Sequence, residues 1–387
     1  MQYLGVDLPA LKSKGAVHTA REISQQPDLW QNVWEVVSEN RRDLQKFLHL
    51  ALSDTKRIII TGAGTSAFIG LSLSGIIQRM TGVVTNAIAT TDLVSHPKDY
   101  FIADVPTLLI SFARSGNSPE SVAAISLAQE ICEKCYHLVI TCNPDGQLAR
   151  YGQEADRFVL ALPSEANDQS LAMTSSYTGM LLAGVLLTAL DDLEAAKRSI
   201  DILSGYGRKI IEYYSPQLAK IAQAEFSRAV FLGSGPFYGT AKESHLKLQE
   251  LTDGRIICKE DSFLGFRHGP KAIIDGSTLV FYIFSNDAYA SKYEKDLVKS
   301  MKKGRPPLIQ VGIMENRMPD LLLDHIFYLS DNGSRLSESY LAVCSVLPAQ
   351  ILGFYKSLNL GLRPDTPSAT GAITRVVEGV QIYDLNV

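Results

Sequence analysis

The chain has 387 residues, of which 46% are hydrophobic, and this is enough for two or three domains with sizeable buried cores. Its 37 basic and 41 acidic residues give a net charge of −4, which excludes the basic surface typical of proteins that bind nucleic acid or an anionic membrane. The sequence shows no apolar run of the roughly 20 residues that a membrane span needs, no signal peptide and no disulfide framework. We therefore expect a globular cytoplasmic protein.

The N-terminal segment is predicted to be helical. Between residues 16 and 52, apolar side chains such as Ile23, Trp30 and Val37 recur at helical spacings. Pro27 is expected to open the second of two helices there, since proline is tolerated at the start of a helix. We expect this segment to supply packing or dimer contacts rather than chemistry.

From Lys56 onward, short apolar runs alternate with helical stretches such as 67–80 and 119–134. The runs are rich in Ile, Val and Leu, which predicts strands that are buried on both faces. This alternation is typical of a parallel sheet with crossover helices. The predicted strands are 57–61, 107–112, 137–142 and 157–162.

The same pattern occurs twice along the chain. The opening strand "RIIITGAG" at Arg57 matches "RAVFLGSG" at Arg228, which lies 171 residues later. Two further pairs of strands keep this offset, and three pairs with one offset indicate an internal duplication. The further pairs are "TLLIS" at 107 with "TLVFY" at 278, and "LVI" at 138 with "IQV" at 309.

The duplication predicts the fold class and the domain organisation. We expect an α/β protein with two tandem domains, each a parallel sheet flanked by helices in the flavodoxin-like or Rossmann-like manner. The predicted limits are 1–45 for an N-terminal helical segment, 46–200 for the first domain and 201–387 for the second.

In the first copy, the opening strand leads into a glycine-rich turn that contains Gly64, Thr65 and Ser66. Such a turn between a strand and a helix presents backbone N–H groups and the positive helix end to an anion. The two hydroxyl groups argue against a dinucleotide, whose pyrophosphate binds bare backbone. They favour a terminal monophosphate, which has three oxygens that hydroxyl groups can bind.

A second polar turn follows the strand 107–112 and contains Arg114, Ser115 and Ser118. In a parallel sheet both turns lie at the carboxyl ends of strands, where ligands bind. The alternative is that these side chains only cap the helices that follow. We favour a cradle for a phosphate monoester that both turns form together.

The second copy has other residues at these turns and carries a different polar set. Pro236 removes a donor N–H, and Phe237 fills the space that a phosphate would occupy. On the next helix, Glu243, Lys247 and Glu250 are spaced i, i+4 and i+7 and therefore share one face. For an isolated helix, a salt-bridged surface would explain this pattern equally well.

These motifs together resemble a known family. The tandem "GAGTS" and "ARSGNS" turns, followed by "ESHLKLQE" at 243–250 and "HGP" at 268–270, are similar to the double sugar isomerase (SIS) domain. The resemblance covers roughly residues 45–387. Within this family, "SFARSGNSPES" and the element "HTAREI" at 18–23 are most similar to the galactosamine-6-phosphate deaminases, also called tagatose-6-phosphate ketose/aldose isomerases.

The resemblance implies a role for each matching residue. Ser66, Ser115 and Ser118 would bind the sugar phosphate, and Thr174 would lie near the sugar. Glu250 would be the base that moves a proton between C1 and C2. His268 would assist ring opening. In the family this histidine can come from the neighbouring subunit, and the resemblance therefore implies at least a homodimer.

The sequence departs from the family pattern at two places. Ala113 replaces a phosphate-binding serine, so Arg114 or backbone groups would have to compensate. The C-terminal lysine of the related synthase is missing, and Arg375 is the nearest basic residue. The chain also begins without the nucleophilic cysteine of a glutaminase domain, so we expect release of ammonia or plain isomerisation rather than synthesis.

The residues suit this chemistry in physical terms. A single carboxylate above the C1–C2 bond, here Glu250, can take a proton from one carbon and return it to the other. A histidine such as His268 can exchange protons near neutral pH during ring opening. Lys247 can stabilise negative charge on the enediol oxygen. The scheme requires no metal or other cofactor, and no histidine or cysteine spacing predicts a metal site.

The predicted function is the isomerising deamination of D-galactosamine 6-phosphate to D-tagatose 6-phosphate and ammonia. A sugar 6-phosphate is thus the expected ligand, with no nucleic acid or membrane partner. The sequence leaves two alternatives open, which are a tagatose-6-phosphate isomerase without deamination and a non-catalytic sugar-phosphate sensor. It also leaves open the choice between galacto and gluco substrates.

Overall fold

The computed structural model describes residues 1–151, 156–377 and 379–385. Contacts divide the chain into two compact units, each of which contains one five-stranded sheet, and we call them the first-sheet unit and the second-sheet unit. Both units combine separate stretches of the chain, and the continuous domain limits given above stay a prediction. The first-sheet unit contains Asp28–Asp168, Ser175–Arg198 and the residues from Ile373 onward, and the second-sheet unit contains Met1–Pro27, Gln169–Thr174 and Ser199–Ala372.

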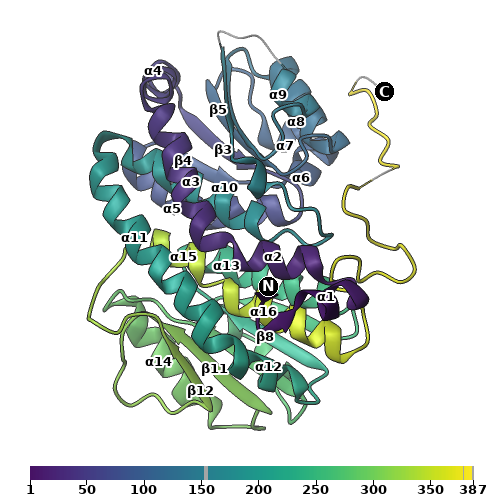
Figure 1. Cartoon of the computed structure of the whole chain (residues 1–387). Helices are drawn as coiled ribbons and strands as arrows, with labels where there is room; N and C mark the ends of the chain where they lie inside the picture. Colours follow the sequence, from purple (N-terminus) through teal and green to yellow (C-terminus); the bar gives the residue numbers. More distant parts are fainter. Residues whose placement is uncertain (152–155, 378, 386–387) are drawn as a thin grey trace. The chain divides into compact units, whose positions relative to one another are not determined.

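The two sheets have the same topology (Figure 1). All strands of the first sheet are parallel in the order β4-β3-β5-β6-β7, and those of the second are parallel in the order β12-β11-β10-β8-β9. The strands of the first sheet are β3 Arg57–Thr61, β4 Val84–Ala87, β5 Thr107–Ala113, β6 Cys135–Thr141 and β7 Arg157–Ala161. Those of the second are β8 Arg228–Leu232, β9 Ile257–Asp261, β10 Thr278–Ile283, β11 Ile309–Met314 and β12 His325–Tyr328.

The offset found in the sequence is retained in the structure. β3 and β8 begin at Arg57 and Arg228, and β5 and β10 begin at Thr107 and Thr278, so each pair is 171 residues apart. This confirms the prediction of two parallel α/β units. The edge strands β4 and β12 were not predicted, because each is only four residues long and partly buried and thus lacks the long apolar run of a central strand.

Helices flank both sheets (Figure 1). The N-terminal helices follow a two-stranded hairpin of β1 Gln2–Tyr3 and β2 Val6–Asp7, and Pro27 lies at the second position of α3. They are α1 Leu8–Lys14, α2 Val17–Ser24, α3 Gln26–Glu39 and α4 Arg41–Leu52. The other helices are α5 Thr65–Thr81, α6 Thr90–Ser95, α7 Pro97–Tyr100, α8 Pro119–Ile131, α9 Gln147–Arg150, α10 Ser175–Leu186, α11 Leu193–Lys209, α12 Ser215–Gln223, α13 Pro236–Leu251, α14 Ala290–Met301, α15 Glu338–Cys344 and α16 Leu347–Asn359.

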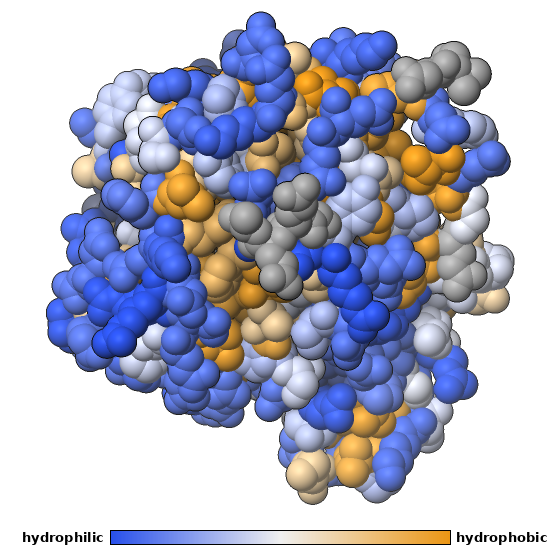
Figure 2. Space-filling model, turned by 90° about the horizontal axis from the view of Figure 1, so that it is seen from above, coloured by the Kyte–Doolittle hydropathy of each residue, from blue (hydrophilic) through white to orange (hydrophobic). Residues whose placement is uncertain are grey.

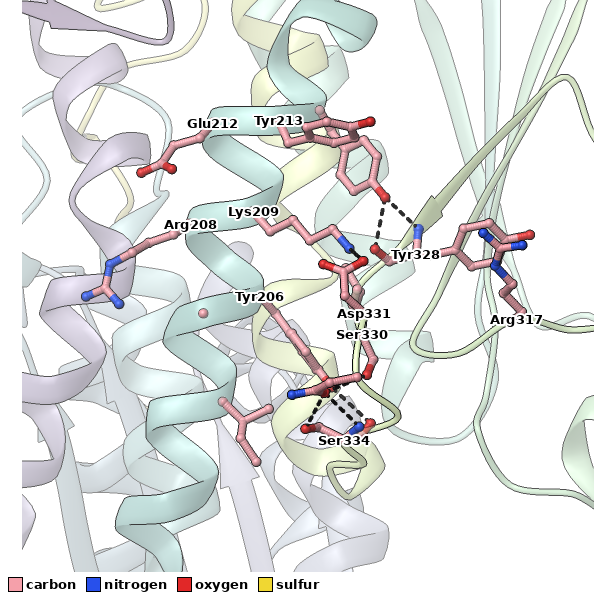
Figure 3. Close-up of a pocket in the computed structure, with 15 residues that line it drawn as sticks. Tyr206, Arg208, Lys209, Glu212, Tyr213, Arg317, Tyr328, Ser330, Asp331 and Ser334 are labelled. Carbon is pink, nitrogen blue, oxygen red and sulfur yellow. Dashed lines mark hydrogen bonds and ion pairs between the residues drawn. The ribbon is translucent and has the colours of Figure 1, made fainter.

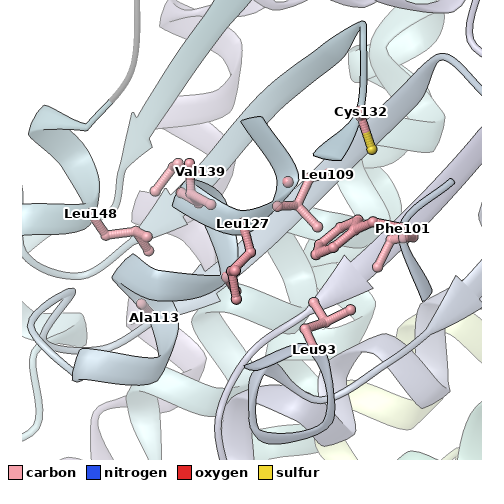
Figure 4. Close-up of a cluster of buried hydrophobic side chains, with 12 residues drawn as sticks. Leu93, Phe101, Leu109, Ala113, Leu127, Cys132, Val139 and Leu148 are labelled. Atoms are coloured by element: carbon pink, nitrogen blue, oxygen red, sulfur yellow. The ribbon is translucent and has the colours of Figure 1, made fainter. Parts of the chain in front are cut away.

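The hydrophobic core of the first-sheet unit determines where its polar turn begins. Leu109 and Ala113 on β5 pack in one cluster with Val139 on β6 and Leu127 on α8, as Figure 4 shows. Because Ala113 is the last residue of β5 and still belongs to this cluster, the chain leaves the core at Arg114. The polar turn therefore starts at the carboxyl edge of the sheet.

The hydropathy of the surface and one apolar helical stretch can be compared with what a membrane-spanning protein would show. The face in Figure 2 is mostly hydrophilic, and hydrophobic residues occupy smaller areas between the hydrophilic ones. One helical stretch, Glu338–Asn359, is long and apolar enough to cross a membrane by length and composition, although the sequence analysis found no such run. Since 89% of its apolar window is buried inside the structure, it has the pattern of a core helix.

Two glycines in each copy shape the turn after the first strand. Gly64 (φ 55°, ψ −124°) and Gly235 (φ 57°, ψ −130°) have nearly identical backbone angles in a region that favours glycine. Two residues earlier, a Cβ on Gly62 would lie 2.6 Å from the Cβ of Ser66, and a Cβ on Gly233 would lie 2.3 Å from the backbone oxygen of Phe237. Both copies therefore need glycine for the same two reasons.

We predict that Gly233→Ala lowers the free energy of unfolding by about 1–3 kcal/mol, because the new methyl group would clash with backbone that cannot move aside. Gly205→Ala on α11 is the matched control, since its methyl group would meet no atom within 4 Å, and it should raise stability by up to ~1 kcal/mol. Urea denaturation of the three proteins measures both effects. Equal stability of Gly233→Ala and the wild type would contradict the close strand–helix approach.

Candidate functional site

The first predicted phosphate turn lies at the N-terminus of α5. Gly64 is the N-cap residue, Thr65 and Ser66 are the first two helical residues, and both side chains are buried. The 17-residue helix α5 directs the positive end of its dipole toward this turn, and this suits an anion.

The second predicted turn, Arg114–Ser118, is braced from within the same unit. Asn143 Nδ2 donates to the backbone oxygen of Ser115 over 2.8 Å, and Leu148 N donates to the backbone oxygen of Gly116 over 2.9 Å. Gly116 has a φ of 65°, a value that favours glycine. The turn is therefore held in one conformation by the segment that follows β6.

Ser118 has the capping role that was considered as the alternative to phosphate binding. It is the N-cap residue of α8. Its Oγ accepts a hydrogen bond from Ser121 N over 3.2 Å and donates one to Ser121 Oγ over 2.7 Å. The Oγ of Ser115 accepts a long hydrogen bond of 3.3 Å from Asn117 N. Phosphate binding by Ser115 and Ser118 stays a prediction.

The sheet brings the two turns together. β3 and β5 are neighbouring parallel strands with Thr61 opposite Ser111, so the turns that follow them leave the same edge. Gly64, Thr65 and Ser66 thus share this edge with the second turn. Binding of one anion by both turns stays a prediction, and their common edge is compatible with it.

A compact ion cluster occupies one face of α13 in the second-sheet unit. Lys247 Nζ lies 2.6 Å from Glu250 Oε2 and 3.3 Å from Glu243 Oε1. The side chains of Lys247 and Glu243 are 1% and 0% exposed, whereas that of Glu250 is 22% exposed. Glu250 is therefore the member of the cluster that a ligand can reach.

The charges in this cluster support one another. Burial by itself would lower the pKa of Lys247, but the carboxylates of Glu243 and Glu250 outweigh it and raise this pKa. The buried side chain is therefore a stable ammonium ion. Its positive charge lies against the carboxylate of Glu250, which is the accessible acidic side chain of the cluster. The spacing found in the sequence thus forms a buried cluster, not a solvated helix surface.

His268 lies in a loop after β9, in the same unit as this cluster. Phe263 and Phe266 are fully buried and anchor the loop, whereas His268 is exposed. Gly269, which follows, has a φ of 115° and separates two short 3₁₀ turns. Thr174 also belongs to the second-sheet unit, where it is fully buried and its backbone oxygen accepts from Gln350 over 3.5 Å.

In the second copy, the first turn is closed by Pro236 and Phe237. Pro236 is the first residue of α13 and has no N–H, and Phe237 is 1% exposed. The position equivalent to Ser66 thus holds a buried aromatic ring. The apolar ring fills this turn and supplies no donor for an anion.

In the second turn of the second copy, the donor groups are already bound to the protein's own acidic side chains. Ser285 N donates to Glu294 Oε2 over 2.9 Å, and Asn286 Nδ2 donates to Glu315 Oε2 over 2.6 Å. Asp287 Oδ1 accepts from two backbone N–H groups at the start of α14, each over 2.9 Å. Acidic side chains thus occupy the donors that a phosphate would need.

Several structural residues of the first-sheet unit were not predicted from the sequence. Asp168 is fully buried, and its Oδ2 accepts from Ser176 N over 2.8 Å and from Ser176 Oγ over 2.5 Å, which caps the start of α10. Asn143 and Gly146 brace the second turn, and "NPDG" at 143–146 is a turn signal that could have found them. Residues from distant parts of the chain meet at Asp168, which no local pattern predicts.

A separate cavity of about 940 Å³ lies in the second-sheet unit, beside α11 and β12 (Figure 3). Lys209 Nζ pairs with Asp331 Oδ1 over 2.6 Å, and Tyr214 Oη donates to the backbone oxygen of Tyr328 over 2.9 Å. Within the described part of the chain, no residue predicted for the site lines this cavity. We assign the cavity no part in the chemistry.

Comparisons with known proteins define the class. Residues 51–190 match the SIS domain family. D-galactosamine-6-phosphate deaminase AgaS from Shewanella sp. (strain ANA-3) is 40% identical, with 96% of this chain and 93% of the relative covered. The Escherichia coli protein of the same name is 38% identical, with 97% of both chains covered. The chain belongs to the SIS domain family.

Solved structures agree with this assignment. Tagatose-6-phosphate ketose/aldose isomerase from Escherichia coli is 34% identical, has a TM-score of 0.86 and is matched over 96% of this chain and 97% of its own. A Clostridium novyi NT protein, described as a candidate for the same activity, is 41% identical, with a TM-score of 0.96 and 99% of both chains covered. These matches confirm the fold of two tandem SIS domains.

Glu294 generates a prediction about pH. Burial, with smaller contributions from Glu338 and Asp287, raises its pKa from 4.5 to about 8, against the bond from Ser285 N. Between these values the folded protein holds one more proton than the unfolded chain, so the free energy of unfolding falls as the pH rises. We expect a loss on the order of 2–3 kcal/mol between pH 6 and pH 9.

Glu294→Gln cannot ionise and should flatten this pH dependence, as measured by urea denaturation at each pH. Asp296→Asn, an exposed substitution on the same helix, is the control and should keep the wild-type slope. If Glu294→Gln and the wild type lost stability equally, Glu294 would not be protonated at neutral pH.

Proposed function

We propose that this protein is an enzyme of amino-sugar catabolism that converts D-galactosamine 6-phosphate and water to D-tagatose 6-phosphate and ammonia. The observation that carries the proposal is the cluster on α13, in which a buried ammonium ion pairs with an accessible carboxylate. The names of the relatives that are about 40% identical over nearly the whole chain support the substrate. The reaction is a hydrolytic deamination that includes an isomerisation.

In the proposed mechanism, Glu250 moves one proton. After ring opening, its carboxylate takes the proton from C2 of the open-chain aldose, which gives an enolamine, and returns the proton to C1. The product is a ketose imine at C2, and water hydrolyses it to the ketone and ammonia. Lys247 holds the Glu250 carboxylate in place by the ion pair and stabilises negative charge on the sugar during the transfer.

The phosphate group fixes the position of the sugar in this proposal. Ser66, Ser115, Ser118 and Arg114, with the N–H groups from Gly64 and Thr65 onward, are the proposed phosphate ligands. Their binding energy lies far from the reacting carbons and can therefore hold C1 and C2 in register with the base. Thr174 is retained as a proposed sugar contact.

His268 is the proposed acid and base for ring opening. Its exposed position in the second-sheet unit is compatible with service to the sugar of a neighbouring subunit, and we therefore propose a homodimer with shared sites. The five cysteines are unpaired, which supports our proposal that the protein works in the cytoplasm.

One assay tests the proposed deaminase function against the two alternatives, a plain isomerase and a non-catalytic sensor. The protein is incubated separately with galactosamine 6-phosphate, glucosamine 6-phosphate and tagatose 6-phosphate, and both ammonia and sugar products are measured. We expect ammonia from galactosamine 6-phosphate. Interconversion of tagatose 6-phosphate without ammonia from either amino sugar would favour a plain isomerase, and binding without turnover would favour a sensor.

Glu250→Gln should lower kcat for deamination by about 10²–10⁴-fold, since the amide cannot accept the proton, and should leave sugar-phosphate binding intact. Steady-state ammonia release and isothermal titration calorimetry measure these effects. Glu212→Gln, an exposed substitution in the same unit, is the matched control and should retain wild-type kcat. Normal turnover by Glu250→Gln would overturn the assignment of the base.

Ser66→Ala should raise KM and the Kd of the sugar phosphate by about 10-fold or more, because a hydrogen bond to a charged group is lost. kcat should change much less, since the hydroxyl lies away from C1 and C2. Ser74→Ala on the same helix is the control and should bind normally. An unchanged Kd for Ser66→Ala would refute the phosphate role of this turn.

A further inference from the structure

Arg375 joins two distant parts of the first-sheet unit. Its Nε donates to the backbone oxygen of Asp168 over 2.8 Å, and its Nη2 donates to Oδ1 of Asn167 over 2.8 Å. In return, Nη2 of Arg114 donates to the backbone oxygen of Arg375. The residue is thus bonded on one side to the turn before α10 and on the other side to the turn after β5.

Both partners of Arg375 are rigid. Asp168 is fully buried, and its carboxylate accepts from the N–H and hydroxyl groups of Ser175 and Ser176 at the start of α10. Arg114 is only 7% exposed and directly follows the last core residue of β5. Arg375 therefore connects a capped helix N-terminus to the phosphate turn.

The charges of these residues gather around one buried side chain. Burial raises the pKa of the Cys142 thiol, Asp168 raises it further, and Arg114 and Arg375 both lower it. Asp168, Arg114 and Arg375 are thus all close to Cys142, which follows the end of β6. This agrees with the hydrogen bonds and places both guanidinium groups at the same end of the sheet.

The guanidinium of Arg375 keeps its positive charge available. Within the described residues, its two acceptors are a backbone oxygen and a side-chain amide oxygen, which are both uncharged. An uncharged acceptor orients a guanidinium group without neutralising it. The positive charge therefore adds to that of Arg114 at the carboxyl edge of the first sheet.

We infer that Arg375 is a positioning residue for phosphate binding: it fixes Arg114 and the turn after β5 against the Asn167–Asp168 turn. The inference rests on the proposed function, in which this turn binds the substrate phosphate. In this way Arg375 supports Arg114, the basic group that we propose compensates for the absence of a serine at position 113. Arg375 takes no part in the proton transfer.

The test compares wild type, Arg375→Ala and Arg375→Lys in two measurements. Calorimetric titration with inorganic phosphate gives the Kd, and steady-state ammonia release gives KM and kcat. We expect Arg375→Ala to raise the Kd and KM by about 10-fold while kcat stays within 3-fold. Arg375→Lys, which keeps the charge and one donor, should recover most of the affinity.

Arg79→Ala removes one exposed positive charge from α5 in the same unit and is the matched control, so its Kd should equal that of the wild type. If Arg375→Ala bound phosphate like the wild type, or lowered thermal stability and kcat with an unchanged KM, the residue would be structural only and the inference would fail. Phosphate binding by the wild type without ammonia release would instead refute the proposed reaction and leave this inference standing.

Discussion

The ion cluster of Lys247 with Glu243 and Glu250 is the interaction on which the proposed chemistry depends. A buried ammonium ion is costly unless carboxylates pair with it, so the three side chains constrain one another and the rotation of α13. The constraint leaves Glu250 at the edge of the cluster, where its side chain is accessible. A carboxylate in this position can reach a proton on carbon.

Duplication explains how the protein acquired two kinds of chemistry on one scaffold. Both copies keep the glycine turn after the first strand, with nearly the same angles at Gly64 and Gly235. After this turn they diverge, since the first copy has Thr65 and Ser66 where the second has Pro236 and Phe237. In the second copy, acidic side chains such as Glu294 accept from the donors that would bind an anion, and α13 carries the ion cluster instead.

Much of the fold could be predicted from the sequence because its signals are local or periodic. Central strands such as β3 and β5 are continuous apolar runs, and their offset of 171 exposed the duplication. β4 and β12 lie at sheet edges, are four residues long and are only partly buried, so neither gives the long apolar run of a central strand. The i, i+4, i+7 spacing on α13 could be found, but its burial depends on packing that the spacing does not encode.

The polar turns also combine features that the sequence predicts with features that it does not. Ser118 before a proline is a recognisable helix cap, and the structure gives it that role. The link of Arg375 to Asp168 spans 207 residues and has no sequence signature. Removal of the C2 hydrogen from the sugar itself tests the central claim most directly. With galactosamine 6-phosphate deuterated at C2, NMR should show that the wild type removes this deuterium as the ketose phosphate forms and that Glu250→Gln removes it at least about 100-fold more slowly. Removal of the C2 deuterium at equal rates by both proteins would contradict proton transfer by Glu250.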